Sequence, residues 1–319
     1  MELSKIKDLA DQVKQNIQQV IVGKEETIDQ LLVALISSGH VLLEDVPGTG
    51  KTLLAKSLAQ SLSCSCKRIQ FTPDLLPSDV TGINFYNQKI GEFEFRQGPI
   101  FSNIILADEI NRATPRTQSS LLECMEEQQT TIDGETHILD KPFLVIATQN
   151  PLESQGTFPL PEAQLDRFLL KLNLGYPSKE EGIAILKRFK EKNPIHELLP
   201  IASKEDIVEA QRLYSKVYVS NDMLSYVIEI IEKTRNHEHI ELGVSPRGSQ
   251  ALLKAVQVYA LLKGRDYVIP DDVKAMIKPV LAHRLILAHT IRLRENQAHL
   301  LLDEILDQVA VPAEELTVK

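Results

Sequence analysis

The residues with the clearest chemical pattern run from Asp45 to Thr52, in the order Asp-Val-Pro-Gly-Thr-Gly-Lys-Thr. A short apolar run at 41–43 precedes them, and a helical pattern of apolar residues follows from Leu53. A strand, a glycine-bearing loop and a helix in this order are typical of a phosphate-binding loop, whose backbone N–H groups face an anion. The sequence therefore predicts a nucleotide site. The expected nucleotide contacts in this loop are Pro47, Gly48, Thr49, Gly50, Lys51 and Thr52.

Each residue type in this loop has a chemical reason. Gly48 and Gly50 let the backbone turn tightly enough for its N–H groups to converge, and a helix that begins near Lys51 adds the positive end of its dipole. The Lys51 ammonium would reach the β- and γ-phosphates of ATP, and the Thr52 hydroxyl would bind Mg²⁺. Asp45 departs from the usual pattern, which has glycine at this first position. A glycine-rich turn with a solvated lysine is the alternative.

A pair of adjacent carboxylates, Asp108 and Glu109, follows the apolar run 104–107. Four consecutive apolar residues predict a strand that is buried on both faces. Charged groups are costly inside a core, but ligands bind at the carboxyl edge of such a sheet. We expect Asp108 to hold Mg²⁺ through water, and Glu109 to orient and polarise the water that attacks the γ-phosphate. A strand that ends in solvated acids is the alternative.

Three further polar residues are candidates for the same phosphate. Asn150 ends the predicted buried strand 143–150, where its amide would fix the attacking water, unless it only caps the turn before Pro151. Arg167 lies late in the predicted nucleotide domain, and a surface ion pair is its alternative role. Arg247 lies in the first turn of a predicted helix, where a cation opposes the helix dipole by about 0.3–1 kcal/mol. A facing anion such as a γ-phosphate would offset that cost; a tolerated surface arginine is the alternative.

An apolar bend at 20–24 separates two helices that the pattern predicts in the first 40 residues. A bend ahead of a phosphate loop often packs on the adenine ring in nucleotide-binding folds. Val22 and Gly23 are therefore candidate contacts with the base. An ordinary turn between two helices is the alternative.

The remaining pattern predicts an α/β domain over residues 1–176 and a helical domain over residues 177–319. A hairpin is expected at 130–138, where Asp-Gly supplies the two positive φ angles of a tight turn, and a two-stranded excursion is expected at 83–96. After residue 176 the pattern predicts helices only, with a kink or interruption near Pro279. The predicted strands of the main sheet are 41–43, 68–71, 103–109, 143–150 and 169–174.

Composition narrows the class of partner. The chain has 319 residues, 43% of them hydrophobic, and a net charge of −9, which disfavours duplex DNA and anionic membranes as partners. No apolar run approaches the roughly 18 residues that span a bilayer, so no membrane insertion is expected. Cys64, Cys66 and Cys124 form neither a disulfide framework nor a four-ligand zinc pattern. We expect reduced thiols and a cytoplasmic protein.

Taken in order, these motifs resemble those of the AAA+ ATPases, specifically the MoxR family. The resemblance covers nearly the whole chain, and an aspartate at position 45 is what this family leads us to expect. No single motif is decisive, but the five in this order are specific. They are Leu43 to Thr52, Ala107 to Arg112 (Ala-Asp-Glu-Ile-Asn-Arg), Ala147 to Pro151 (Ala-Thr-Gln-Asn-Pro), Pro161 to Phe168 (Pro-Glu-Ala-Gln-Leu-Asp-Arg-Phe) and Ser245 to Arg247 (Ser-Pro-Arg).

The resemblance implies roles at the matching positions. Asn150 is similar to sensor 1, Arg167 to the arginine finger that enters the neighbouring subunit's site, and Arg247 to sensor 2. The excursion at 83–96 is similar to the helix-2 insert, and the hairpin at 130–138 to the pre-sensor-1 hairpin. The fold implied is an α/β P-loop NTPase core, a parallel sheet between helices, followed by an all-α lid. Family members form rings, usually hexamers. They act as chaperone-like remodellers, often with partners that carry von Willebrand factor A domains.

Three other functions compete with a protein remodeller. Related AAA+ branches with the same inserts move or load nucleic acids, but the insert tips here carry mixed or acidic charge, as at Lys89, Glu92 and Glu135. A magnesium-chelatase-like subunit falls within the same clade. A binding module that uses ATP only as a conformational switch is the third. Multiple turnover would exclude the switch, and stimulation by single-stranded DNA would favour the motor.

Overall fold

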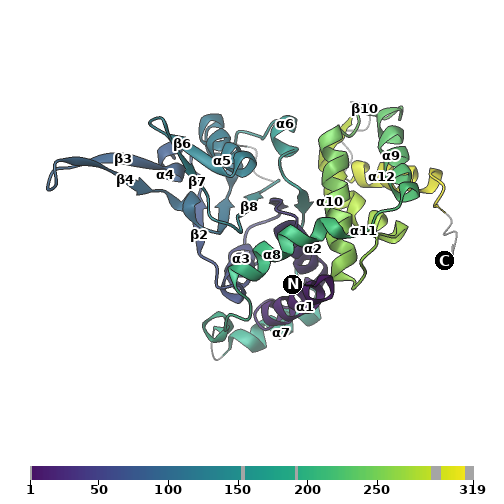
Figure 1. The fold of residues 1–319 in the computed structure, drawn as a ribbon, viewed down its shortest axis with the longest axis horizontal. Coiled ribbons are helices and arrows are strands. Elements are labelled where there is room, and N and C mark those ends of the chain that lie inside the picture. Colours follow the sequence, from purple (N-terminus) through teal and green to yellow (C-terminus); the bar gives the residue numbers. More distant parts are fainter. Residues whose placement is uncertain (1, 152–154, 191–192, 289–295, 313–319) are drawn as a thin grey trace.

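The structure is a computed structural model that describes residues 2–151, 155–190, 193–288 and 296–312. Its centre is a five-stranded sheet in the order β2-β5-β8-β1-β9, and every neighbouring pair is parallel (Figure 1). A parallel sheet has its ligand-binding edge at the carboxyl ends of its strands. The strands are β1 Val41–Glu44, β2 Cys66–Gln70, β5 Ile104–Asp108, β8 Leu144–Gln149 and β9 Leu170–Leu172.

Helices cover both faces of this sheet, which explains the continuous apolar runs in its strands. Along β5, Ile104 and Leu106 belong to one buried cluster, and Ile105 and Ala107 belong to the other. Successive side chains of a strand point to opposite faces, so every residue of a central strand must be apolar. The first face carries α1 (Leu3–Gln18), α2 (Glu25–Ile36) and α3 (Lys51–Ser61), and the second carries α4 (Pro77–Thr81) and α5 (Pro115–Glu127).

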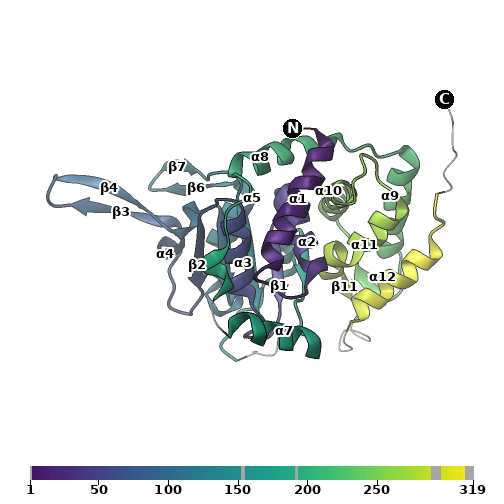
Figure 2. The ribbon, with the colours of Figure 1, turned by 90° about the horizontal axis from the view of Figure 1, so that it is seen from below.

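Two hairpins leave the core at one end of the molecule, as the sequence predicts. The longer pairs β3 (Gly82–Asn87) with β4 (Glu92–Gln97) and extends far from the sheet (Figures 1 and 2). The shorter pairs β6 (Gln129–Ile132) with β7 (Glu135–Ile138). Its turn residues Asp133 and Gly134 have φ angles of 49° and 89°, which confirms the predicted tight turn.

The carboxyl-terminal part is mainly helical, with one correction to the sequence-based prediction. The prediction of helices alone was wrong, because β10 (Ile240–Leu242) and β11 (Ile286–Leu287) form an antiparallel pair. Two and three residues are too few to give a strand pattern, so only their meeting in space reveals the pair. The helices here are α9 Asn221–Arg235, α10 Pro246–Leu262, α11 Pro270–Leu281 and α12 Gln297–Gln308.

The structure gives further detail on three of the helices. Helix α5 begins at Pro115, and Ile110–Arg112 before it form a separate 3₁₀ turn, η2. Of the kink or interruption expected near Pro279, the interruption is excluded, because α11 runs through Pro279 to Leu281 and passes into a 3₁₀ turn at Ala282–Arg284, η5. The kink stays a prediction. A short helix, α6, covers Glu162–Leu165 before β9.

The two predicted domains share one hydrophobic core. Helix α10 packs against α1 and α2, and α8 (Lys204–Leu213) packs against α2 (Figure 1). Helix α7 (Lys179–Phe189) lies beside α1 and donates a hydrogen bond from Arg188 to the Gln18 carbonyl. A division at residue 176 therefore stays a prediction. Within the described residues, no helix has the length and apolar character needed to cross a bilayer.

Candidate active site

Three strand ends meet at one edge of the sheet and bring the predicted phosphate-binding residues together. The phosphate loop follows β1, Asp108 ends β5 with Glu109 directly after it, and Asn150 follows β8. Strand β8 lies between β5 and β1, in parallel register with both. Because carboxyl ends of parallel strands share one edge, the loop, the acids and Asn150 are neighbours. Asn150 is partly buried there.

The phosphate loop has the backbone that the glycine pattern predicts. Gly48 and Gly50 have φ angles of 86° and 94°, and no atom lies within 4 Å of the point where a Cβ would stand at either residue. Helix α3 begins at Lys51, so its first N–H groups face the loop. The Lys51 ammonium donates hydrogen bonds to the carbonyls of Asp45 and Val46, at 3.0 and 3.1 Å. Positive φ, open space and a helix N-terminus together fit a triphosphate.

Asp45 turns its side chain into the protein and stabilises the start of the loop. It is 3% exposed, and its Oδ1 accepts a hydrogen bond from the Val46 N–H at 2.8 Å. Its own N–H donates to the Gln149 carbonyl at 3.1 Å, which ties the loop to β8. The departure from glycine at this position thus leaves the glycine-bearing half of the loop unchanged.

The acid pair is held by Thr148 on the adjacent strand. The Thr148 hydroxyl donates to Asp108 Oδ1 at 2.6 Å and accepts from the Glu109 N–H at 2.9 Å. Arg68 on β2 donates to the other oxygen of Asp108 at 2.6 Å. These contacts orient the Asp108 carboxylate, and carboxylate oxygen is the ligand type that Mg²⁺ prefers.

Glu109 adopts a strained backbone and is oriented by β2. Its φ angle is 57°, a left-handed conformation that a glutamate rarely takes and that is frequent at functional sites. The Gln70 side-chain amide donates to Glu109 Oε2 at 2.7 Å, and Arg112 forms a 3.4 Å ion pair with the same oxygen. The carboxylate is fixed at the sheet edge, where it would polarise water.

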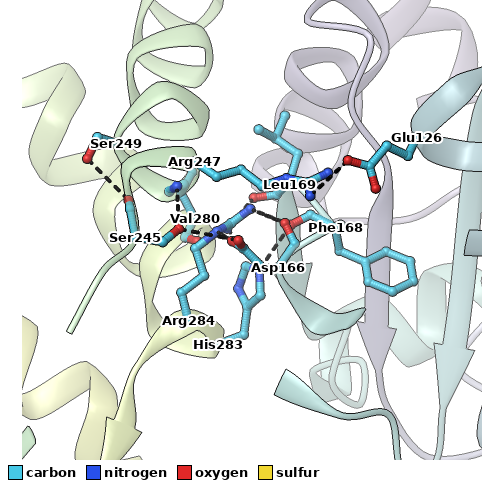
Figure 3. A network of polar contacts seen from close by, with 11 residues as sticks. Glu126, Asp166, Phe168, Leu169, Ser245, Arg247, Ser249, Val280, His283 and Arg284 are labelled. Carbon is cyan, nitrogen blue, oxygen red and sulfur yellow. Dashed lines mark hydrogen bonds and ion pairs between the residues drawn. The ribbon is translucent and has the colours of Figure 1, made fainter. Parts of the chain in front are cut away.

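Arg167 and Arg247 lie at the opposite edge of the sheet, away from the phosphate loop of their own chain. Arg167 precedes β9 and forms a 3.2 Å ion pair with Glu126 at the end of α5. Arg247, near the start of α10, pairs with the other Glu126 oxygen at 3.1 Å (Figure 3). Together with His40, which precedes β1, they line a cavity of about 360 Å³. Strand β1, whose four residues span about 13 Å, separates this cavity from the loop at its other end.

Buried His40 supports this second edge. Its Nδ1 accepts from the Val145 N–H and its Nε2 donates to the Met125 carbonyl, both at 3.0 Å. Burial lowers the pKa of His40 to about 4, against a smaller opposing effect of the Met125 carbonyl. The imidazole is therefore neutral at pH 7. It holds the end of α5, and with it Glu126, against the sheet.

Comparison with known proteins decides the family. A model of the ATPase family associated with various cellular activities (AAA) matches residues 40–170, and a model of the AAA lid domain matches residues 232–305. Chaperone MoxR1 of Mycobacterium tuberculosis is 42% identical over 93% of this chain and 80% of its own length. The chain belongs to the MoxR family of AAA ATPases.

Two further proteins match this chain over almost their whole length. The uncharacterised protein YeaC of Bacillus subtilis is 52% identical, over 96% of this chain and 95% of its own. A crystal structure of a candidate ATPase from Cytophaga hutchinsonii has a TM-score of 0.92 at 40% identity, with 98% of each chain covered. The family and the fold inferred from the five motifs are thus confirmed, and the protein is an ATP hydrolase.

The bend before α2 packs against helix α7, a contact that the sequence did not predict. Gly23 has a φ of 66°, and a Cβ there would stand 1.9 Å from Glu181 Oε1 on α7. The neighbouring Lys24 ammonium donates to the Tyr176 carbonyl at 3.2 Å. Val22 is partly buried. The bend is thus a packed junction with α7, and its contact with adenine stays a prediction.

Sequence reasoning missed Arg68, Gln70 and Thr148 in this MoxR site, as well as Glu126 at the second edge. Arg68, Gln70 and Thr148 could have been found from the sequence, because polar residues near the carboxyl ends of predicted strands are expected at a ligand-binding edge. Glu126 carried no such signal, since it reads as one more acid on the exposed face of a helix.

Proposed function

We propose that this MoxR-family ATPase is a Mg²⁺-dependent, ring-forming remodeller of protein complexes, in which each ATP site is completed by the next subunit. The observation that carries this proposal is the separation of Arg167 from its own phosphate loop. A guanidinium group at the opposite edge of the sheet stabilises a γ-phosphate only if that phosphate comes from a neighbouring chain. A head-to-tail contact of this kind closes into a ring when its rotation permits.

In this mechanism the chain's residues divide between two subunits. One subunit binds ATP through the backbone of Gly48 to Gly50 and the Lys51 ammonium. Its Glu109 removes a proton from the attacking water, and Asn150 holds that water in line. Thr52 and Asp108 would hold Mg²⁺, which neutralises charge on the β- and γ-phosphate oxygens when bound.

The neighbouring subunit supplies positive charge where the transition state gains negative charge. Arg167 acts as the arginine finger, a group worth about 10³–10⁵ in rate in related phosphoryl-transfer systems. Arg247 acts as sensor 2 from the same neighbour, because Glu126 holds both guanidinium groups in one cavity. A monomer would accordingly be a poor enzyme.

A protein client is favoured over nucleic acid. The Mycobacterium relative is named as a chaperone. The long hairpin has exposed apolar side chains at Ile90 and Phe93, beside the acids Glu92 and Glu94, and this mixture suits a protein surface better than a phosphate backbone. We propose clients that include von Willebrand factor A domain proteins. A nucleic-acid motor or a magnesium-chelatase-like subunit is the competing function.

Mixed rings test whether two subunits contribute different residues to one ATP site. Neither Lys51→Ala nor Arg167→Ala protein should hydrolyse ATP efficiently alone. In rings of demonstrated mixed composition, activity should return, because one subunit supplies an intact phosphate loop and the other an intact finger. Absence of recovery would exclude action in trans. Stimulation of the parent rate by single-stranded DNA, but not by protein clients, would favour the motor instead.

A further inference from the structure

Arg284, in the 3₁₀ turn η5 after α11, reaches across from the helical lid to the segment that carries Arg167 (Figure 3). Its side chain is only 3% exposed, and its Nε donates to Asp166 Oδ1 at 2.6 Å. A buried guanidinium loses its hydration, and it is tolerated when a carboxylate and further acceptors replace the lost water. The guanidinium of Arg284 is surrounded by such acceptors.

The N–H groups of Arg284 are fully used. An arginine side chain has five N–H donors in a planar fork. Beside the bond to the Asp166 carboxylate, Nη2 donates to the carbonyls of Asp166 and Phe168 at 3.1 and 2.8 Å, and Nη1 donates to those of Leu169 and Val280. Five acceptors therefore match five donors. A lysine has three donors on a flexible stem and cannot reproduce this pattern.

Four of the five acceptors belong to residues on the two sides of Arg167 in the sequence, and the fifth is the Val280 carbonyl of α11. The guanidinium of Arg284 holds the backbone at Asp166, Phe168 and Leu169, so the direction in which the Arg167 side chain leaves is set. His283 holds the same backbone segment, since its Nε2 lies 3.0 Å from the Phe168 carbonyl. Because a carbonyl oxygen can only accept, His283 Nε2 is the donor in that contact.

Asp166 also connects this segment to the helix turn that carries Arg247. Its second oxygen accepts a hydrogen bond from the Ser245 hydroxyl at 3.3 Å, and Ser245 caps α10 by accepting from the Gly248 N–H at 3.1 Å. Arg247 lies in that capped turn. One carboxylate therefore joins the backbone before Arg167 to the helix start that carries Arg247 (Figure 3).

We infer that Arg284 and Asp166 are positioning residues that hold Arg167 and Arg247 at a fixed spacing for the neighbouring subunit's γ-phosphate. The inference rests on the proposed function in trans and adds to it. A misplacement of about 1 Å can cost a factor of about 10² in rate. Arg284→Lys keeps the charge but loses the fork, so it should lower kcat by about 10- to 100-fold. Nucleotide binding, which uses the opposite sheet edge, should be unchanged.

A second mixed-ring experiment separates positioning from damage to the fold. Arg284→Lys subunits mixed with Lys51→Ala subunits should recover activity, because the first retain a working phosphate loop and the second a well-placed finger. The matched control is Arg265→Lys, which alters another lid arginine that pairs with a buried aspartate, Asp272, at 2.7 Å. It should leave kcat close to that of the parent, even if it lowers the melting temperature.

The outcomes are distinguishable from a failure of the proposed function. Recovery in the Arg167→Ala mixture without recovery in the Arg284→Lys mixture would overturn the positioning role and leave action in trans intact. Absence of recovery in both mixtures would overturn both proposals. Weakened binding of a fluorescent ATP analogue by Arg284→Lys would also contradict the inference. The phosphate loop lies at the opposite edge of the sheet, so such a loss would show that the substitution disturbs the fold in general.

Discussion

Arg167 and Arg247 pair with the two oxygens of one carboxylate, that of Glu126, at 3.2 and 3.1 Å. The two arginines are 80 residues apart in sequence and come from different parts of the fold. Two like charges in one cavity repel, so an anion between them stabilises their approach. In the free chain Glu126 supplies that anion, and in a ring the neighbouring γ-phosphate would approach the same two guanidinium groups.

Glu126→Gln should disturb activity far more than stability. The Glu126 side chain is 34% exposed, and a pair of this kind contributes under about 1 kcal/mol to the free energy of unfolding. Without the charge of Glu126, the two guanidinium groups repel each other and no longer point to the same place, so kcat should fall. Phosphate release and chemical denaturation measure the two effects. Glu127→Gln, an exposed neighbour, is the control, and equal rates for the two variants would contradict the role of Glu126.

Glu109→Gln should keep ATP binding and stop turnover. The amide preserves size and hydrogen bonding but cannot take a proton from water, and loss of a general base costs about 10²–10⁴ in rate. Nucleotide affinity and kcat should be measured on the same preparation. A variant that hydrolyses ATP at the parent rate would show that Glu109 is not the base. The inactive variant should also retain clients for co-purification.

Thr148→Val should lower both stability and kcat. Thr148 is 1% exposed, and its loss leaves the Glu109 N–H without its acceptor, at a cost of about 1–3 kcal/mol in free energy of unfolding. Both acids lose a contact, so kcat should fall by about 10- to 100-fold. Thr117→Val is the control, since Thr117 is equally buried and donates to the Leu75 carbonyl away from the acids. It should lower stability while leaving the kcat of folded protein unchanged.

Stability should fall between pH 7 and pH 5. The pKa of His40 is about 4 in the folded protein and about 6.5 when unfolded, so the unfolded chain binds more protons in this window. Stability from the neutral imidazole is complete above the unfolded pKa and decreases as pH falls toward the folded value. His40 alone should remove about 2 kcal/mol by pH 5. Burial also lowers the pKa of His283, which adds in the same direction. Denaturant unfolding at both pH values measures this, and an unchanged free energy would contradict it.

Local patterns were enough to predict the phosphate edge of the sheet. The apolar runs before Asp45 and Asp108 predicted buried strands, because a strand covered on both faces must be apolar throughout. Parallel strands then place their following residues at one edge, so the loop, the acids and Asn150 could be predicted to meet. The Asp133-Gly134 turn was predictable for a similar reason, since few residue pairs accept two positive φ angles.

The sequence by itself thus determined the family, the sheet and the residues that meet at the carboxyl edge of that sheet, all of which depend on short-range spacing. Only the tertiary structure decided that Glu126 joins Arg167 to Arg247, that Arg284 holds the segment around Arg167, and that β10 pairs with β11. Those contacts join segments about 40 to 120 residues apart, and the contacts of Arg247 and Arg284 also need the lid to be packed onto the core. Such contacts depend on the packing of whole elements in three dimensions, which no local periodicity records.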